Sequence, residues 1–585
     1  NMNPEGGRFV SCEFVTQLSK LRKLSAESVE NTKRFDPFKE YLHVERQVEK
    51  ELRELLRDIN NHPGKCLVLL CGSAGDGKSH LISLLKNSDS EQLLADYEPY
   101  NDATESAEPT MTSIETLAEK LSPFNDENYY KDDGKRMIVA INLGTLNNFI
   151  DSEKSKNFSA LKEFVLANDI ISGFSHSVGY KENSVFQYVS FADYQVFSLG
   201  ENGPETAFLK QLVSKVFIQS DENPFYLACS SCSNCPVAAR CPVRHNYEFL
   251  SNQAVQDYLI GRIIEVVIAD KAIVSTREVL NLIYDLIVHP DFDQSQIRVG
   301  INDVVFLTNY IGWSTPMLLN EYTDISGLIN ELKTHDILLE RNSLLDESVT
   351  HFHTIENIEK EFCAATVNTP YSVLNNLTNV SVLGGIKPEL KKVIYRFIVR
   401  LKHFSQTDAA SKKRKHMEFI RYLYWQNCGD EKKLGKLYEA TKKAVMSWNG
   451  QFDDDYICID DSNDQVWILE QLQLKSAINK SAEHIDGTID RFFPNLRLGF
   501  RRDDQSEVVT ISVDFALFEL ICNMREGYRP TIQDKNRHAD FVSFIQQLID
   551  FGNKSSRITI IPKDGAQSVK MVFEETEFGY EFKVV

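Results

Sequence analysis

The sequence predicts an α/β fold built on a parallel β-sheet, followed by helical regions and a C-terminal α+β domain. Two runs, Cys66–Cys71 and Met137–Leu143, are largely apolar, as expected for central strands that helices cover on both faces. Helical patterns at Lys78–Leu85 and Thr112–Leu121 alternate with them, which favours an α/β sheet. After residue 453 short alternating runs predict strands around helices at 516–525 and 539–549. These runs are 456–460, 466–470, 508–515, 557–562, 570–575 and 579–585.

The composition is that of a globular protein with a packed core. Hydrophobic residues make up 42% and charged residues 25% of the chain. No apolar run approaches the roughly 18 residues that a membrane helix needs, so we expect no membrane contact and a cytoplasmic location. The net charge of −20 argues against a chain whose whole surface coats nucleic acid.

The loop after the first apolar run predicts phosphate binding. It reads Gly-Ser-Ala-Gly-Asp-Gly-Lys-Ser over Gly72–Ser79 and fits the pattern G-x-x-x-x-G-K-[ST]. Its backbone N–H groups and the next helix N-terminus suit an anion. Lys78 is expected to reach the β- and γ-phosphates and Ser79 to bind magnesium. A chance match is the alternative, but the buried strand before the loop and the helix after it favour ATP binding in an AAA+-like P-loop NTPase fold. The expected nucleotide-binding residues are Gly72, Gly75, Asp76, Gly77, Lys78, Ser79 and His80.

Hydrolysis needs further residues, and the sequence offers three besides Lys78. The run Met137–Leu143 places Asn142, not an acid, near its end, so Asn142 is a candidate sensor of the γ-phosphate or of the attacking water. Asp102 follows a short expected strand at 97–100, and its alternative role is in a helix cap. Arg277 lies in the first turn of a helix capped by Ser275, where positive charge is unfavourable. Arg277 is therefore a candidate sensor arginine, or else an ordinary surface residue.

Four cysteines lie close together in sequence and predict a metal site. Cys229, Cys232, Cys235 and Cys241 follow the spacing C-x2-C-x2-C-x5-C. Four thiolates can close a tetrahedral zinc site. An iron–sulfur cluster and free or paired thiols are the alternatives. The other cysteines are scattered, which favours a reducing compartment.

A basic stretch reverses the charge of the chain locally. Between Lys387 and Lys415 ten positive residues outnumber two negative ones. Lys392, Arg396 and Arg400 are four residues apart and so share one helix face. This face could contact a phosphate backbone; a solvated face or a patch for an acidic partner is the alternative.

Several segments together resemble the DptF (DndF-like) family of phosphorothioation-dependent DNA restriction. They lie along nearly the whole chain, in a characteristic order. They are FDPFKEYLHVERQVEKEL (35–52), NDATES (101–106), VAINLGTLNNF (139–149), NPFYLACSSC with CPVRHNY (223–247), STREVLNLIYDLIV (275–288) and GYRPT (527–531).

The resemblance implies a bacterial P-loop ATPase subunit that acts with DptG- and DptH-like partners on DNA lacking the phosphorothioate mark. No nuclease motif is visible in this chain, so cleavage is expected in a partner. The alternatives are a non-hydrolysing nucleotide-binding scaffold of the same complex and a signalling ATPase unrelated to DNA. The chain could also form a homo-oligomer.

We expect five parts along the 585 residues, more than one ordinary domain would hold. They are an N-terminal helical segment (1–60), a P-loop nucleotide-binding domain (61–200), a lid region with the four-cysteine site (201–300), a helical domain (301–450) and a C-terminal α+β domain (451–585).

Overall fold

The chain forms two compact units. The first comprises residues 1–197 and 206–411, and the second comprises residues 198–205 and 412–585. The finer division into five parts stays a prediction. The computed structural model describes residues 12–27, 37–62, 64–87, 89–100, 112–172, 179–292, 297, 304–321, 327–339, 343–354, 358–376, 388–405, 415–450, 456–460, 464–478, 485–502, 507–550, 558–564 and 571–584.

A four-stranded parallel sheet organises the N-terminal part of the first unit. Its strands are β1 (Cys66–Gly72), β2 (Tyr97–Tyr100), β3 (Arg136–Asn142) and β4 (Phe186–Ser190), in the order β2-β3-β1-β4. The expectation of an α/β fold with a parallel sheet is therefore confirmed. From β1 the chain runs to β2 and β3, which lie on one side of β1 in the sheet. It then continues to β4, which lies on the other side of β1. Ligands of open α/β sheets bind at the carboxyl ends of the strands, at such a reversal of strand order.

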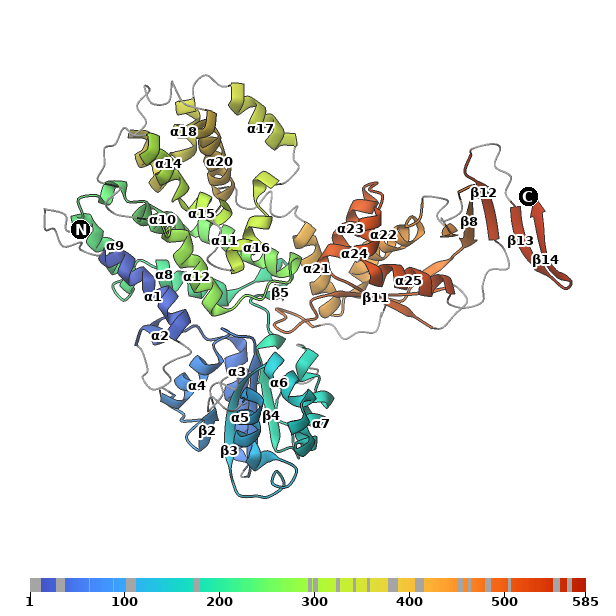
Figure 1. Ribbon diagram of the computed structural model, residues 1–585, viewed down its shortest axis with the longest axis horizontal. Coiled ribbons are helices and arrows are strands. Elements are labelled where there is room, and N and C mark those ends of the chain that lie inside the picture. The colour runs from blue at the N-terminus through green and yellow to red at the C-terminus, as the bar shows by residue number, and fades with distance from the viewer. Residues whose placement is uncertain are drawn as a thin grey trace. The chain divides into compact units, whose positions relative to one another are not determined.

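Helices cover both faces of this sheet (Figure 1), which explains why every residue of β1 is buried. One face packs against α3 (Gln47–Asn61) and α4 (Lys78–Asn87). The other packs against α5 (Ser113–Lys120), α6 (Leu143–Asp151) and α7 (Ser159–Ala167). Alternate residues of β1 enter the two cores, because successive side chains of a strand point to opposite faces.

The rest of the first unit is mainly helical. Local sequence signals define where the helices begin. For example, the Ser275 side chain caps the N-terminus of α12 and forms a capping box with Glu278. The helices are α1 (Glu13–Glu27), α2 (Pro37–Tyr41), α8 (Ala207–Phe217), α9 (Pro224–Ser231), α10 (Pro242–Leu250), α11 (Gln253–Ala269), α12 (Thr276–Ile287), α14 (Val304–Gly312), α15 (Thr315–Glu321), α16 (Gly327–Thr334), α17 (Ser343–Thr354), α18 (Ile358–Thr366) and α20 (Pro388–Ser405).

Helix α1 is attached to α12 through a buried carboxylate. Arg22 Nη2 lies 3.2 Å from Asp285 Oδ1, whose side chain is fully buried. Burial raises the pKa of Asp285 to about 7, although Arg22 opposes the shift. The folded chain therefore holds a proton on Asp285 at a pH where the unfolded chain has released it.

Asp285→Asn is expected to remove a pH dependence of stability between about pH 4 and pH 7. In that window the folded state binds the extra proton, so the free energy of unfolding falls as the pH rises, by up to about 4 kcal/mol. Thermal unfolding midpoints of wild type and variant across this range check the prediction. Asp257→Asn, an exposed position on α11, is the control. Parallel pH profiles of wild type and Asp285→Asn would contradict it.

The second unit contains two antiparallel sheets and a hairpin. The hairpin, β5 (Ser198–Gly200) with β6 (Gly203–Glu205), lies in the chain between two segments of the first unit, and Leu199 exchanges backbone hydrogen bonds of 2.9 Å with Ile489. The sheets have the orders β11-β10-β9 and β14-β13-β12-β8-β7. Their strands are β7 (Tyr456–Asp460), β8 (Val466–Gln471), β9 (Leu474–Ser476), β10 (Leu496–Arg502), β11 (Val509–Val513), β12 (Ile558–Pro562), β13 (Met571–Thr576) and β14 (Gly579–Val584).

The helices of this unit are α21 (Lys415–Asn427), α22 (Gly435–Met446), α23 (Phe515–Arg525), α24 (Ile532–Arg537) and α25 (Ala539–Asp550). The alternating runs predicted after residue 453 are confirmed as strands, and both predicted helices are present. β9 and β10 are additional.

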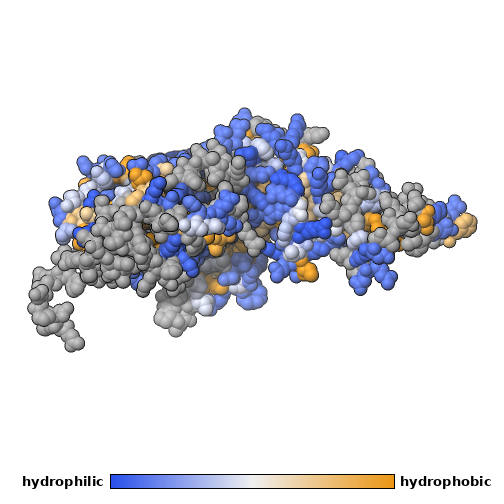
Figure 2. All heavy atoms as spheres, turned by 90° about the horizontal axis from the view of Figure 1, so that it is seen from above, coloured by the Kyte–Doolittle hydropathy of each residue, from blue (hydrophilic) through white to orange (hydrophobic). Residues whose placement is uncertain are grey.

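Hydrophilic residues prevail on the molecular face drawn in Figure 2, with hydrophobic ones in small, separate groups. Among the helices of the described residues, none is long and apolar enough to span a membrane.

Candidate functional site

The glycine loop, Gly72–Ser79, joins the carboxyl end of β1 to the first turn of α4. Gly75 and Gly77 have φ values of 86° and 95°, a backbone region that a side chain disfavours. Gly72 is required for a different reason, since a Cβ there would lie 2.9 Å from Phe191 Cβ. The loop backbone is therefore compatible with glycine at all three positions and with little else.

Polar contacts hold the loop in a closed form. The Lys78 ammonium donates to the Ser73 carbonyl at 2.5 Å, and the Ser73 N–H donates to the Asp76 carboxylate. Lys78 is only 7% exposed. Burial raises the pKa of Asp76, while the positive charge of Lys78 and the Ser73 N–H oppose the shift. Asp76 thus acts within the loop, and the Lys78 side chain folds back onto the start of the loop.

Ser79 and His80 follow in the first turn of α4 and are half-buried. His80 Nε2 lies 3.2 Å from His43 Nδ1, and His43 in turn lies 3.0 Å from Glu49. Burial and the neighbouring His43 lower the pKa of His80 to about 4, so its ring is neutral near pH 7. A nucleotide contact of His80 stays a prediction, because the described partner of its ring is another histidine.

Asn142 ends β3 at the same edge of the sheet. It pairs in register with Gly72, the first residue of the glycine loop. Its side chain makes no capping hydrogen bond to α6, which begins at Leu143. The structure therefore brings Asn142 beside the loop, as expected for the polar residue near the end of a neighbouring apolar strand. Asp102, the acid proposed from the sequence, lies outside the described residues.

The N-terminus of α12 also lies against the loop. A Cβ on Gly75 would lie 3.0 Å from Ser275 Oγ and 3.4 Å from Arg277 Cβ. Residues separated by two hundred positions in the chain thus meet at the loop. The position of Arg277 permits the sensor role that the sequence suggested.

Arg277→Ala is expected to reduce nucleotide turnover about tenfold or more while leaving nucleotide affinity nearly unchanged. The reason is that a cation aimed at a terminal phosphate acts mainly on charge that develops during the reaction. Phosphate release and nucleotide titration measured side by side check this, with Lys210→Ala, exposed on α8, as control. Unchanged turnover would remove Arg277 from the site.

Sequence reasoning missed two residues near the loop. Arg46 donates to the Asp76 carbonyl at 3.3 Å, and its guanidinium lies 5.1 Å from the Phe191 ring centre and 4.8 Å from that of Phe208. Asp193 is buried just after β4 and interacts electrostatically with Cys71 of β1. The signal for Asp193 was the run before it, which ends in acid, whereas no pattern around Arg46 distinguished it from the neighbouring charged residues.

The four predicted metal ligands lie along a run of short elements from α9 to α10. Cys229 is in α9, Cys232 begins η5 (Cys232–Asn234), Cys235 follows it, and Cys241 caps α10. Burial raises the pKa of Cys229 and of Cys241 to about 12 and that of Cys232 to about 11. As they are placed in the described part of the chain, no three His, Cys, Asp or Glu side chains form a group that could hold a metal ion. Four cysteine sulfurs are ligands of the kind that zinc prefers. In the described residues these sulfurs are not arranged around an ion.

His245, which follows Cys241 in the chain, has a different role. It is buried, and its Nδ1 contacts the Tyr310 hydroxyl. Burial lowers its pKa to about 4. A neutral histidine held by a buried tyrosine belongs to the core between α10 and α14.

The basic helix face at Lys392, Arg396 and Arg400 is largely neutralised. Arg400 is buried and pairs with Asp336 and Glu321, and Arg396 lies 2.8 Å from Glu321. The expectation that this shared face meets a phosphate backbone is therefore wrong for Arg400, whose charge is satisfied inside the unit. Lys412, Lys413 and Arg414 lie outside the described residues.

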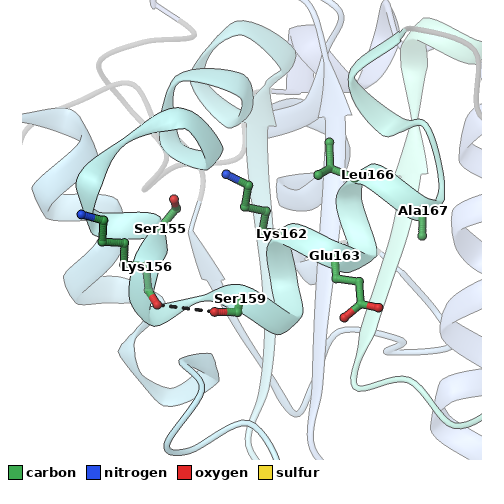
Figure 3. A pocket seen from close by; sticks show the side chains of 7 residues that line it. All are labelled: Ser155, Lys156, Ser159, Lys162, Glu163, Leu166 and Ala167. Atoms are coloured by element: carbon green, nitrogen blue, oxygen red, sulfur yellow. Dashed lines mark hydrogen bonds between the residues drawn. The ribbon is translucent and has the colours of Figure 1, made fainter.

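A shallow cavity of about 610 Å³ opens on the surface beside α7, and none of the predicted site residues lines it. Figure 3 shows Lys156 and Lys162 among the residues that line it, and Lys162 donates to the Ile150 carbonyl at 3.0 Å. Its lining residues are Ser155, Lys156, Ser159, Lys162, Glu163, Leu166 and Ala167. Nothing in this lining suggests a ligand.

A scan of the chain against protein-family models found no match, and searches of curated proteins and of solved structures found none either.

Proposed function

We propose that this chain is an ATP-binding and ATP-hydrolysing subunit with an AAA+-like P-loop NTPase fold, in which the helices after β4 form a lid. The observation that carries the proposal is the meeting of two distant segments with the glycine loop and its own buried lysine. Asn142 adjoins its first residue, Arg277 approaches Gly75, and the Lys78 side chain folds back onto its start. A nucleotide phosphate is the anion that suits such a site.

Each residue then has a defined task. Lys78 would leave the Ser73 carbonyl and bind the β- and γ-phosphates, while the loop N–H groups hold the phosphate oxygens. Ser79 would hold magnesium, which neutralises charge on the phosphates. Asn142 would orient water or the γ-phosphate, and Arg277 would stabilise the charge that develops on it. The acid that positions water is assigned to Asp102.

The proposed cellular role is in phosphorothioation-dependent DNA restriction, with DptG- and DptH-like partners and unmodified DNA as the target. The resemblance of the segments to DptF proteins suggests this role. The structure adds that three of them converge on the glycine loop: 35–52 through Arg46, 139–149 through Asn142 and 275–288 through Arg277. Nuclease activity is assigned to a partner.

We also propose a structural zinc ion bound by the cysteines of the 229–241 region. Cys241 is the N-cap residue of α10, and a helix N-terminus is a position that stabilises a thiolate. Zinc would replace the thiol protons and crosslink α9 to α10. Mass spectrometry of the bound metal, with iron and sulfide measured in parallel, separates zinc from an iron–sulfur cluster.

One observation favours a second function, that of a nucleotide-binding scaffold. One of the two strands beside β1, β3, ends in Asn142 and not in an acid, which favours a nucleotide-binding scaffold that assembles the complex without turnover. ATP would then act by stabilising the bound conformation.

The deciding experiment measures phosphate release by the full chain with no addition, with unmodified DNA, and with the partner subunits. DNA-stimulated release that Lys78→Ala abolishes supports the restriction ATPase. Nucleotide binding without release supports the scaffold. Release that neither DNA nor the partners change would overturn the restriction role and favour a signalling ATPase.

A further inference from the structure

The three-stranded sheet of the second unit has one buried and one exposed face. Its order is β11-β10-β9, and its neighbouring strands are antiparallel. The buried face is apolar and packs against α22 and α25, where the Phe500 ring lies 5.2 Å from that of Tyr438 and 5.9 Å from that of Phe544. The exposed face consists of the alternate strand positions, because successive side chains of a strand point to opposite sides. Its residues are Lys475, Arg497, Gly499, Arg501, Thr510 and Ser512.

Positive charge dominates this exposed surface, which we call the cationic sheet face. Three of its six strand positions are Lys or Arg and none is acidic. Lys475, Arg497 and Arg501 are exposed, as are the hydroxyl-bearing residues Thr510 and Ser512. The whole chain has a net charge of −20, so it repels a polyanion except at local positive surfaces of this kind.

Two of the cations lie directly opposite each other. Arg501 pairs in register with Lys475 on the neighbouring antiparallel strand, which places their Cβ atoms about 4.5–5.5 Å apart. Like charges in such a pair repel each other and destabilise a sheet. A bound anion would offset this repulsion, so the pair favours an anionic partner.

Arg497 is the third cation and lies at the other end of the face. It precedes Arg501 by four residues on β10, which is about 13 Å along the strand. Its guanidinium lies 4.1 Å from the Phe493 ring centre, a contact that orients it. Between the two arginines lies Gly499, where a Cβ would be 2.8 Å from Val508 Cγ1. The face therefore has two positive ends, separated by a centre that Val508 covers.

We propose that the cationic sheet face binds the phosphate backbone of duplex DNA. Arg497 contacts one phosphate, and Arg501 together with Lys475 contacts another, because about 13 Å spans several phosphates of one strand. The Thr510 and Ser512 hydroxyls donate to phosphate oxygens nearby, and such contacts carry no base sequence information. The inference rests on the restriction role proposed above and adds the surface of this chain that meets the DNA.

The test is the triple variant Lys475→Gln, Arg497→Gln, Arg501→Gln in the full chain. Binding to an unmodified fluorescent DNA duplex is measured by anisotropy, with ATP present, at several salt concentrations. The variant should bind at least about tenfold more weakly at low salt, and the slope of log affinity against log salt should fall by about 3, since each phosphate contact contributes about 1. Its thermal unfolding midpoint should stay at or above that of wild type, because the repulsion between Arg501 and Lys475 is gone.

The control replaces three exposed lysines of the first unit, Lys86, Lys120 and Lys210, by glutamine. It changes the net charge equally, so DNA affinity and salt slope should stay close to those of wild type. A further variant, Ser512→Glu, places a carboxylate across from Arg497. It should weaken DNA binding without loss of stability, and it decides the matter if the triple variant fails to fold.

Wild-type affinity and salt slope in the triple variant and in Ser512→Glu would overturn the proposal and leave the ATPase proposal standing. Equal weakening in the lysine control would attribute the effect to net charge and overturn it as well. Loss of binding to the partner subunits at unchanged DNA affinity would make the face a protein contact instead. A wild-type chain that binds no duplex would refute the DNA contact, whereas the nucleotide site is tested separately by phosphate release.

Discussion

Lys78→Ala is expected to lower ATP turnover about a hundredfold to a thousandfold and to weaken nucleotide binding. Lys78 is buried, and its ammonium donates to the Ser73 carbonyl. Loss of a single preorganised donor to a developing anion commonly costs this much. Phosphate release and the titration of a fluorescent nucleotide analogue measure the two effects separately.

The matched control is Lys86→Ala, which removes an exposed lysine from the last turn of the same helix. It alters the net charge equally but lies at the other end of α4, so turnover should stay within twofold of wild type. Equal losses in both variants would mean that α4 is destabilised and that the loop has no special part. Normal turnover in Lys78→Ala would refute the nucleotide site.

Arg400→Ala is expected to lower the free energy of unfolding of the first unit by about 3–5 kcal/mol. Arg400 Nη2 lies 2.5 Å from Asp336 Oδ2 and Nη1 lies 2.7 Å from Glu321 Oε1, with only 5% of the arginine side chain exposed. Removing one partner leaves the buried charge of Asp336 uncompensated, which costs energy of this order. Denaturant unfolding followed by circular dichroism measures the change.

Lys402→Ala is the control, because its side chain is 51% exposed and lies 3.9 Å from Glu361. A surface pair at this distance contributes little, so the variant should unfold within about 0.5 kcal/mol of wild type. If Arg400→Ala left stability unchanged but weakened DNA binding, the basic face would be a nucleic-acid contact after all.

The sequence predicted the features that depend on local pattern. β1, β3 and the glycine loop follow from apolar runs and from glycine chemistry, and the structure has them at the predicted positions. β4 was not predicted, because Gln187 interrupts its apolar run. Inside the fold the Gln187 side chain is satisfied by hydrogen bonds to the Lys181 backbone at 2.9 Å, which only the tertiary structure reveals.

Contacts between residues far apart in the chain limited how much of the candidate site could be predicted from the sequence. Asn142 was suggested by its place near the end of an apolar strand and Arg277 by its charge in the first turn of a helix, and both adjoin the glycine loop. The role of Arg46 could not be predicted, because its partner is a backbone carbonyl in the loop. The error at Arg400 has the same origin, since helical spacing identifies a shared face but does not show that Asp336 lies opposite it.

The hairpin Ser198–Glu205 has a consequence for how the chain can be divided and how it folds. Because this segment belongs to the second unit while residues on both sides of it belong to the first, no single cut in the chain yields two complete units. A fragment that ends at Ser411 carries a hairpin without the Ile489 backbone that Leu199 pairs with. During synthesis the hairpin emerges long before residues 412–585, so it must wait for the C-terminal part of the chain. The second unit is therefore completed last. The first unit has to fold although its stretch of the chain is interrupted by a hairpin that belongs to the second unit.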